Sequence, residues 1–132
     1  MVNEGKLSKR VRLFRGAFVF LSWTLVACIV VQTYIAGMAV FQEPSRWSMH
    51  VSFVHIFEFI PLLMIAFAFA GRMPKGTGWL SFALFALIYC QYFTANLPAA
   101  GALHPVLALA LIVLSLIVAR RSSRYRGGGI VP

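Results

Sequence analysis

Charged residues are scarce in this chain of 132 residues, where Asp, Glu, Lys and Arg make up only 11% and hydrophobic residues 61%. Ordinary soluble domains carry about 25% charged residues, so this composition excludes a soluble domain. The length excludes two domains of usual size. Acidic residues are especially few, at three, and histidines are equally few, at three. The sequence therefore predicts one integral membrane domain with very few ionisable groups available for chemistry.

Cysteine is almost absent as well. Cys28 and Cys90 each lie deep inside an apolar run, and the chain has no CxxC, no Cys-His haem-attachment motif and no zinc-finger spacing. This excludes covalently attached haem and the cysteine-based zinc sites. We expect both cysteines to be small buried apolar residues, since a thiol in lipid is weakly acidic and unreactive.

What the chain has in quantity is long apolar runs. A helix needs roughly 20 residues to cross the hydrocarbon core of a bilayer, and four runs approach or exceed that length. Uninterrupted runs also exclude the alternating pattern of a membrane barrel. We predict an all-α membrane protein, an antiparallel bundle of four transmembrane helices at about 16–41, 49–70, 79–97 and 103–119. Within the second helix, Pro61 predicts a modest kink near Glu58.

The net charge of +9 is concentrated at three places: before the first helix, between the second and third, and after the fourth. This placement indicates topology rather than nucleic-acid binding. By the positive-inside rule both termini face the cytoplasm, so we expect a multi-pass protein of the bacterial inner membrane, N-in and C-in. Residues 1–15 are predicted to be a basic cytoplasmic lead-in and 120–132 a disordered basic tail, and both could attract anionic lipids.

Ionisable side chains inside the apolar runs are the candidate functional groups, because they are costly at membrane depth. His50, His55 and Glu58 lie within nine positions of the second helix, and His104 opens the fourth. Each predicted hairpin carries a Gln on its outward helix, Gln32 or Gln91, and a His on its returning helix. This faint two-fold pattern suggests a duplication.

Two ways of estimating depth pair these residues differently. Counting from the basic flanks places His55 level with His104, Gln32 and Gln91, whereas counting inward from the outer ends matches His50 with His104. The second and fourth helices are diagonal partners in an up-down bundle. Imidazoles on diagonal helices at one depth suit the axial coordination of a planar macrocycle. We therefore predict haem b held by His104 and either His50 or His55.

The leading functional hypothesis is a b-type haem protein, an electron-transfer or haem-carrier subunit near the outer face, working between a membrane quinol and a redox or respiratory complex. Glu58 could be a proton relay, a quinol-site base or a hydrogen-bond partner of the third-helix tyrosines. Two alternatives are a non-catalytic accessory or assembly subunit and a small proton-coupled transporter that uses Glu58. No residue is predicted to be catalytic.

Short motifs carry a family resemblance over about residues 19–119. The motifs are Gln32-x-x-x-Ala36-Gly37, Trp47-x-x-His50 and Leu103-His104-Pro105. They resemble a small bacterial family of four-helix membrane proteins classed as a domain of unknown function. A looser resemblance is to one half of haem A synthase and to the b561-type cytochromes. It implies that His50 and His104 match the recurring His pattern.

Overall fold

The computed structural model describes residues 7–127. Its α-helices and two 3-10 turns follow in the order α1 (Lys9–Phe41), η1 (Pro44–Arg46), α2 (Trp47–Phe57), α3 (Ile60–Ala70), α4 (Thr77–Asn96), η2 (Pro98–Ala100) and α5 (Leu103–Arg126). No strand occurs in this part of the chain. Four segments are long and apolar enough to span a membrane, with η1, α2 and α3 together forming the second. The predicted fold class is confirmed.

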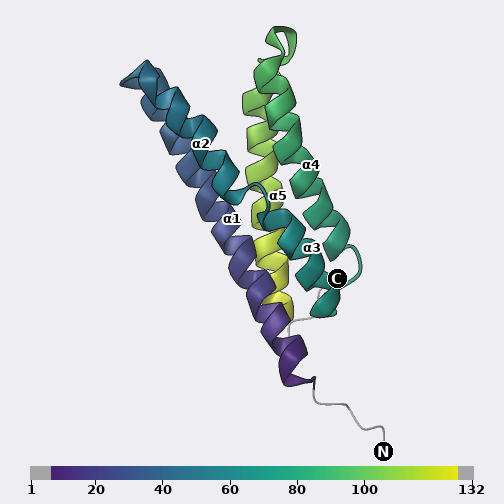
Figure 1. Cartoon of the computed structure of the whole chain (residues 1–132). Helices are drawn as coiled ribbons and strands as arrows, with labels where there is room; N and C mark the ends of the chain where they lie inside the picture. Colours follow the sequence, from purple (N-terminus) through teal and green to yellow (C-terminus); the bar gives the residue numbers. More distant parts are fainter. Residues whose placement is uncertain (1–6, 128–132) are drawn as a thin grey trace, which may run out of the picture.

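The helices pack as two antiparallel hairpins, and Figure 1 shows their arrangement. The first hairpin is α1 with α2 and α3, and the second is α4 with α5. We call the end that carries η1 and η2 the hairpin end, and the end that carries Lys9, residues 71–76 and Arg126 the terminal end. Helix α1 packs on α3 and α5, and α4 packs on α3 and α5. The second span is thus diagonal to α5, as an up-down bundle requires.

Two helices extend beyond their predicted limits at the terminal end. Helix α1 begins at Lys9, inside the segment expected to be a lead-in, because the Ser8 hydroxyl caps it by accepting the Val11 N–H at 3.3 Å. Helix α5 continues to Arg126, so most of the predicted disordered tail is helical. The rest of that tail, residues 128–132, lies outside the described residues, as do residues 1–6 of the lead-in.

The second span breaks at Glu58 and Phe59, between α2 and α3. Pro61 stands in the first turn of α3, where its missing N–H is tolerated, and it cannot donate to the Phe57 carbonyl as a continuous helix would require. The chain instead closes a short turn, with the Leu62 N–H bonding the Phe59 carbonyl at 3.1 Å. The break lies where Pro61 predicts a kink, and it leaves α2 packed chiefly on α1.

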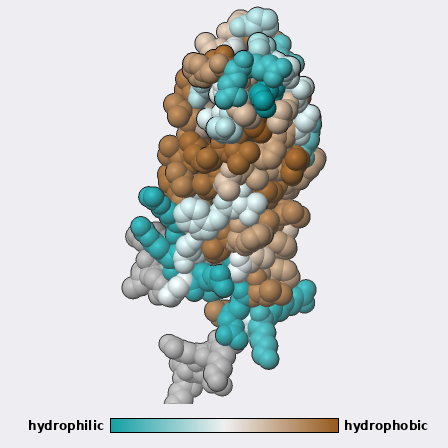
Figure 2. Space-filling view, turned by 90° about the vertical axis from the view of Figure 1, so that its left-hand side faces the viewer, coloured by the Kyte–Doolittle hydropathy of each residue, from teal (hydrophilic) through white to brown (hydrophobic). Residues whose placement is uncertain are grey.

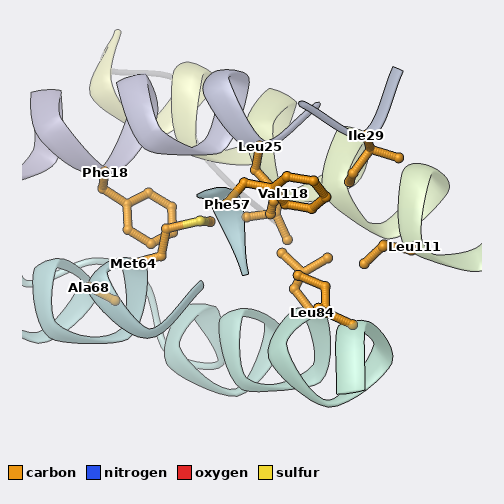
Figure 3. Close-up of a cluster of buried hydrophobic side chains, with 10 residues drawn as sticks. Phe18, Leu25, Ile29, Phe57, Met64, Ala68, Leu84, Leu111 and Val118 are labelled. Atoms are coloured by element: carbon orange, nitrogen blue, oxygen red, sulfur yellow. The ribbon is translucent and has the colours of Figure 1, made fainter. Parts of the chain in front are cut away.

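The buried core runs along the inside of all four spans, and Figure 3 shows the main side chains. The cluster comprises Phe18, Leu25 and Ile29 of α1, Phe57 of α2, Met64 and Ala68 of α3, Leu84 and Ile88 of α4, and Leu111 and Val118 of α5. Phe18, Leu25, Met64 and Leu84 are completely buried. In a bilayer such packing supplies dispersion contacts rather than a gain from leaving water.

The outside of the bundle is equally apolar. Large hydrophobic side chains such as Phe20, Phe69 and Val113 are more than half exposed. Figure 2 shows an apolar band on the face next to α1 and α2, with hydrophilic residues gathered towards the two ends. A surface of this kind fits contact with lipid chains and would be unusual for a protein in water.

Candidate functional site

The first element of the site is a reciprocal pair of residues in the first hairpin. The Gln32 side chain of α1 donates its Nε2 hydrogen to the His50 carbonyl of α2 at 2.8 Å. In return, the His50 imidazole Nδ1 lies 3.2 Å from the Gln32 carbonyl oxygen. Both side chains are partly buried, and Gln32 Oε1 is buried with no hydrogen-bond partner within residues 7–127. The pair fixes α2 against α1 near the hairpin end.

The second hairpin repeats this arrangement. His104 Nδ1 of α5 lies 3.1 Å from the Gln91 carbonyl oxygen of α4 and 3.2 Å from the Thr94 hydroxyl. With its amide turned so that both ends find partners, Gln91 donates Nε2–H to the His104 carbonyl at 3.0 Å and accepts the Ala108 N–H at 2.7 Å. Each hairpin therefore holds one Gln and one His that exchange hydrogen bonds through each other's backbone.

The contacts indicate the chemical form of the two imidazoles. The side-chain hydrogen-bond partner of His50 Nδ1 is the Gln32 carbonyl oxygen, which can only accept, so this Nδ1 carries the hydrogen. His104 Nδ1 faces the Gln91 carbonyl in the same way, and the turned Gln91 amide nitrogen also lies 3.0 Å from it, so we assign His104 the same tautomer by analogy with His50. Among the described residues neither His50 nor His104 bonds through Nε2. Metal-binding imidazoles in proteins are usually oriented by such a bond from the other ring nitrogen to a backbone carbonyl.

The two histidines come together across the bundle. Their ring centroids lie 6.3 Å apart, with the ring planes at 57°. The Trp47 indole meets the His50 ring edge-on at 5.5 Å, at the start of α2. In Figure 1 the outer parts of the two hairpins diverge towards the hairpin end. The His50 ring comes from the first hairpin and the His104 ring from the second.

His55 belongs to a different cluster. Its Nδ1 lies 3.2 Å from Glu58 Oε1 and 3.1 Å from the Tyr92 hydroxyl. Tyr92 of α4 donates its hydroxyl hydrogen to Glu58 Oε2 at 2.7 Å. The Glu58 carboxylate is buried at the break between α2 and α3, while the His55 side chain is 56% exposed. This triad joins the second span to α4, and one of the three predicted roles of Glu58, partner of a third-helix tyrosine, matches the contact.

The structure thus divides the predicted site residues into two groups. His50, His104, Gln32 and Gln91 form the paired site, and His55 with Glu58 forms the triad. Sequence reasoning named the third-helix tyrosines as possible partners of Glu58 without choosing Tyr92, and it gave no role to Thr94, although the polar residues of the outer half of α4 were a signal for both. In residues 7–127 no three His, Cys, Asp or Glu side chains gather as a metal site. The imidazole pair has therefore only two protein ligands to offer.

Four apolar spans with polar pairs inside them define a multi-pass membrane protein. The model of a family of unknown function, DUF6220, matches residues 32–100, more than half of the chain. The protein therefore belongs to that family. The matched segment includes Gln32, His50 and Gln91, and it ends four residues before His104. No curated protein and no solved structure matches the chain.

Proposed function

We propose that this protein binds one b-type haem between His50 and His104 and serves as an electron-transfer subunit of the membrane. The observation that supports the proposal is the repeated Gln–His pair, which gives each hairpin one imidazole with its Nδ1 hydrogen bonded to a carbonyl and its Nε2 lone pair free. Neutral imidazole nitrogen is a good axial ligand for haem iron.

The number of ligands favours haem over a simple metal ion. A zinc site in a protein takes at least three protein ligands, and the described chain brings only two together. A haem would bring most of the ligands of its iron itself, so it would need only two from the protein. His50 and His104, whose ring centroids lie 6.3 Å apart, would be those two.

The surroundings also suit a flat ring inserted between the hairpins. Helix α2 packs chiefly on α1, so its outer part can move away from α4 and α5 without breaking a large interface. Ala36 and Gly37 add little bulk to α1, and a side chain at Gly37 would meet nothing within 4 Å. Gln32 Oε1 is a buried acceptor that finds no partner among residues 7–127, and such a group normally bonds a bound molecule or water.

When bound, haem b supplies one-electron transfer. His50 and His104 would hold it, and the backbone carbonyls of Gln32 and Gln91, which lie against the Nδ1 atoms of these two residues, would raise the basicity of the ligating nitrogens. As electron donor we propose a membrane quinol, and as acceptor a redox or respiratory complex of the same membrane. A haem-carrier role would use the same site.

The charge distribution supports one orientation of the protein in the membrane. Arg and Lys residues gather at the terminal end, where Arg15 bonds the Gly71 carbonyl at 2.8 Å and stacks on Tyr125 at 4.6 Å. By the positive-inside rule we propose that this end faces the cytoplasm of a bacterium and that the haem lies towards the outer face of the inner membrane. The exposed Arg10, Arg120 and Arg124 are placed to attract anionic lipid head groups.

The test is an absorption spectrum of the purified protein, oxidised in air and then reduced with dithionite, after expression with haem supplied. We expect a Soret band that shifts on reduction and sharp α and β bands, which indicate a six-coordinate b-type haem. Replacing His50 or His104 by Ala should remove the haem. A colourless protein despite ample haem would overturn the proposal and favour an accessory or assembly subunit.

His55→Ala is the matched control, because His55 lies on the same helix but outside the paired site. It should keep the full spectrum. Adding free imidazole to His104→Ala should restore a six-coordinate spectrum when haem is supplied, since the small ring can fill the space left by the side chain. Haem loss in His55→Ala together with haem retention in His50→Ala would reverse the assignment of the ligands.

A further inference from the structure

The outer half of α4 carries an aromatic hollow beside the His55 triad. Four residues on one face of the helix and Leu97 just after its end line a shallow, open space of about 470 Å³, and the four are Tyr89, Tyr92, Phe93 and Asn96. Tyr89 and Phe93 are 43% and 66% exposed on a helix that spans the membrane, so the hollow opens towards lipid.

The triad supplies polar groups at the edge of this hollow. Tyr92 is common to both, because its ring lines the hollow and its hydroxyl bonds Glu58 at 2.7 Å. The His55 ring stacks on the Tyr92 ring, with centroids 5.8 Å apart and planes at 27°. Tyr92, Tyr89 and Phe85 form a row of aromatic side chains along α4. The ring centroids of Tyr92 and Tyr89 lie 5.8 Å apart, and those of Tyr89 and Phe85 lie 4.5 Å apart.

One polar atom in this arrangement is left without a partner. His55 Nδ1 faces Glu58 and Tyr92, but its Nε2 makes no hydrogen bond to any residue from 7 to 127. The side chain is 56% exposed on an apolar surface. Leaving a polar group in hydrocarbon without a hydrogen bond costs free energy, so this nitrogen would be stabilised by a ligand that bonds it. Because the nitrogen faces lipid, that ligand has to be soluble in lipid.

We propose that the His55 triad and the hollow on α4 form a binding site for the head group of a membrane quinone, in its oxidised or reduced form. The flat apolar ring would lie against Tyr89, Tyr92 and Phe93, and one ring oxygen would bond His55 Nε2. An imidazole nitrogen can accept from a quinol hydroxyl or, when protonated, donate to a quinone carbonyl. The isoprenoid tail would leave through the open side into lipid.

This inference rests on the proposed function, for which it supplies the site of the electron donor. The positions agree with that role. His55 lies five residues from His50 on α2, a rise of about 7.5 Å along the helix. The quinone ring and the proposed haem would thus be about 7.5 Å apart along the bundle axis, with α2 contributing a residue to each site.

The experiment uses the full chain, loaded with haem, in lipid nanodiscs that contain an azido-quinone photolabel. Labelled positions are mapped by mass spectrometry, and an unlabelled short-chain quinone competes for the site. We expect saturable labelling of residues 89–97 and of α2 near His55. The competitor should bind roughly tenfold more weakly to His55→Ala, which removes the group that bonds it, and more weakly to Tyr92→Phe, which removes the hydroxyl that orients His55 and Glu58.

The matched control is Phe82→Ala, which removes an exposed aromatic ring of α4 nearer the terminal end, where it pairs with Trp79. It should leave the labelling unchanged. Labelling that spreads over the lipid-facing surface without saturation would overturn the inference, and so would equal competitor affinity in all variants. His55→Ala tests the site without endangering the fold, because this side chain is more than half exposed.

An absorption spectrum of the same samples separates this inference from the proposed function. Haem bands without saturable labelling would refute the quinone site and leave the haem assignment standing. Saturable labelling that depends on His55 in a protein that never takes up haem would support the quinone site and refute the electron-transfer role.

Discussion

The buried serines of the terminal half and the large polar side chains of the hairpin half form hydrogen bonds in different ways. In the terminal half, buried serines bond back to their own helices, with Ser22 donating to the Phe18 carbonyl at 2.8 Å and Ser81 to the Thr77 carbonyl at 3.0 Å. In the hairpin half, Gln32, Gln91 and Tyr92 bond to residues of a neighbouring helix.

The difference separates packing from chemistry. A serine whose hydroxyl is bonded within its own helix presents little more than a methyl group to its neighbours, which lets helices approach closely. Ser115 and Ser122 of α5 follow the same pattern. The polar groups of the hairpin half are larger, and they leave ring nitrogens of His50, His55 and His104 with a free lone pair. We therefore assign the stability of the bundle chiefly to the terminal half and ligand binding to the hairpin half.

Ser81→Phe should cause the largest loss of folding stability, and it tests the close packing of the terminal half. Ser81 is completely buried, so a large ring there would force α4 away from its neighbours. Overpacking usually costs 1–3 kcal/mol, and we expect about 3 kcal/mol for a change of this size. Ser81→Ala is the control and should cost well under 1 kcal/mol, since the lost bond lies within one helix. Reversible unfolding in mixed micelles measures both, and equal stability of the two variants would contradict close packing.

Leu84→Ala should have the next largest effect. Leu84 is completely buried in the core cluster, whereas Leu109 of α5 is 67% exposed and serves as a matched control. In water a buried Leu→Ala change costs 2–5 kcal/mol, but the transfer term is largely lost in lipid, so about 2 kcal/mol is expected from the cavity. Leu109→Ala should change stability by less than about 0.5 kcal/mol. A similar loss in both variants would show that the core cluster is not packed.

Gln32→Leu and Gln91→Leu test the cross-helix hydrogen bonds of the hairpin half. Gln32→Leu removes one cross-helix hydrogen bond and Gln91→Leu removes two, for a loss of about 1 kcal/mol in stability per bond. If the paired site holds haem, each should also lower haem affinity, by roughly tenfold at most, because the side chain that holds the His backbone is lost while the backbone carbonyl that bonds the imidazole stays. Haem titration of the apoprotein measures this second effect. Thr33→Val is a suitable control on α1, because the Thr33 hydroxyl bonds only its own helix.

Tyr92→Phe should give the smallest change in stability, about 0.6 kcal/mol, the average for a hydrogen bond between membrane helices. It removes only the hydroxyl that bonds Glu58. Tyr34→Phe is the control, since Tyr34 is 65% exposed and its hydroxyl makes no hydrogen bond within residues 7–127. A loss of several kcal/mol for Tyr92→Phe would mean that the triad supports the bundle itself, which the comparison above assigns to the terminal half.

The four spans were predictable from the sequence because a run of about 20 apolar residues has few alternatives in a membrane. The break before Pro61 followed from the chemistry of proline in the same way. The true ends of α1 and α5 were not predictable from hydropathy. Basic side chains at Lys9 and Arg126 remain helical beyond the apolar run, since a helix does not have to end where the hydrocarbon does.

The partner of His104 was only partly predictable. Counting from the basic flanks favoured His55, and counting from the outer ends favoured His50, which is the residue found beside it. Basic flanks are poor depth markers because long side chains reach the interface from several positions. The reciprocal Gln–His contacts depend on rotamers and helix approach, which no sequence pattern specifies.

The repeated Gln–His pair also bears on how such a protein is made. Each pair is complete within one hairpin, since Gln32 and His50 share the first and Gln91 and His104 share the second. Membrane helices insert first and associate afterwards. Each hairpin can therefore leave the translocon with its imidazole already oriented, and the two half-sites meet only when the hairpins associate. Maturation of the site and the final assembly of the bundle are then one event.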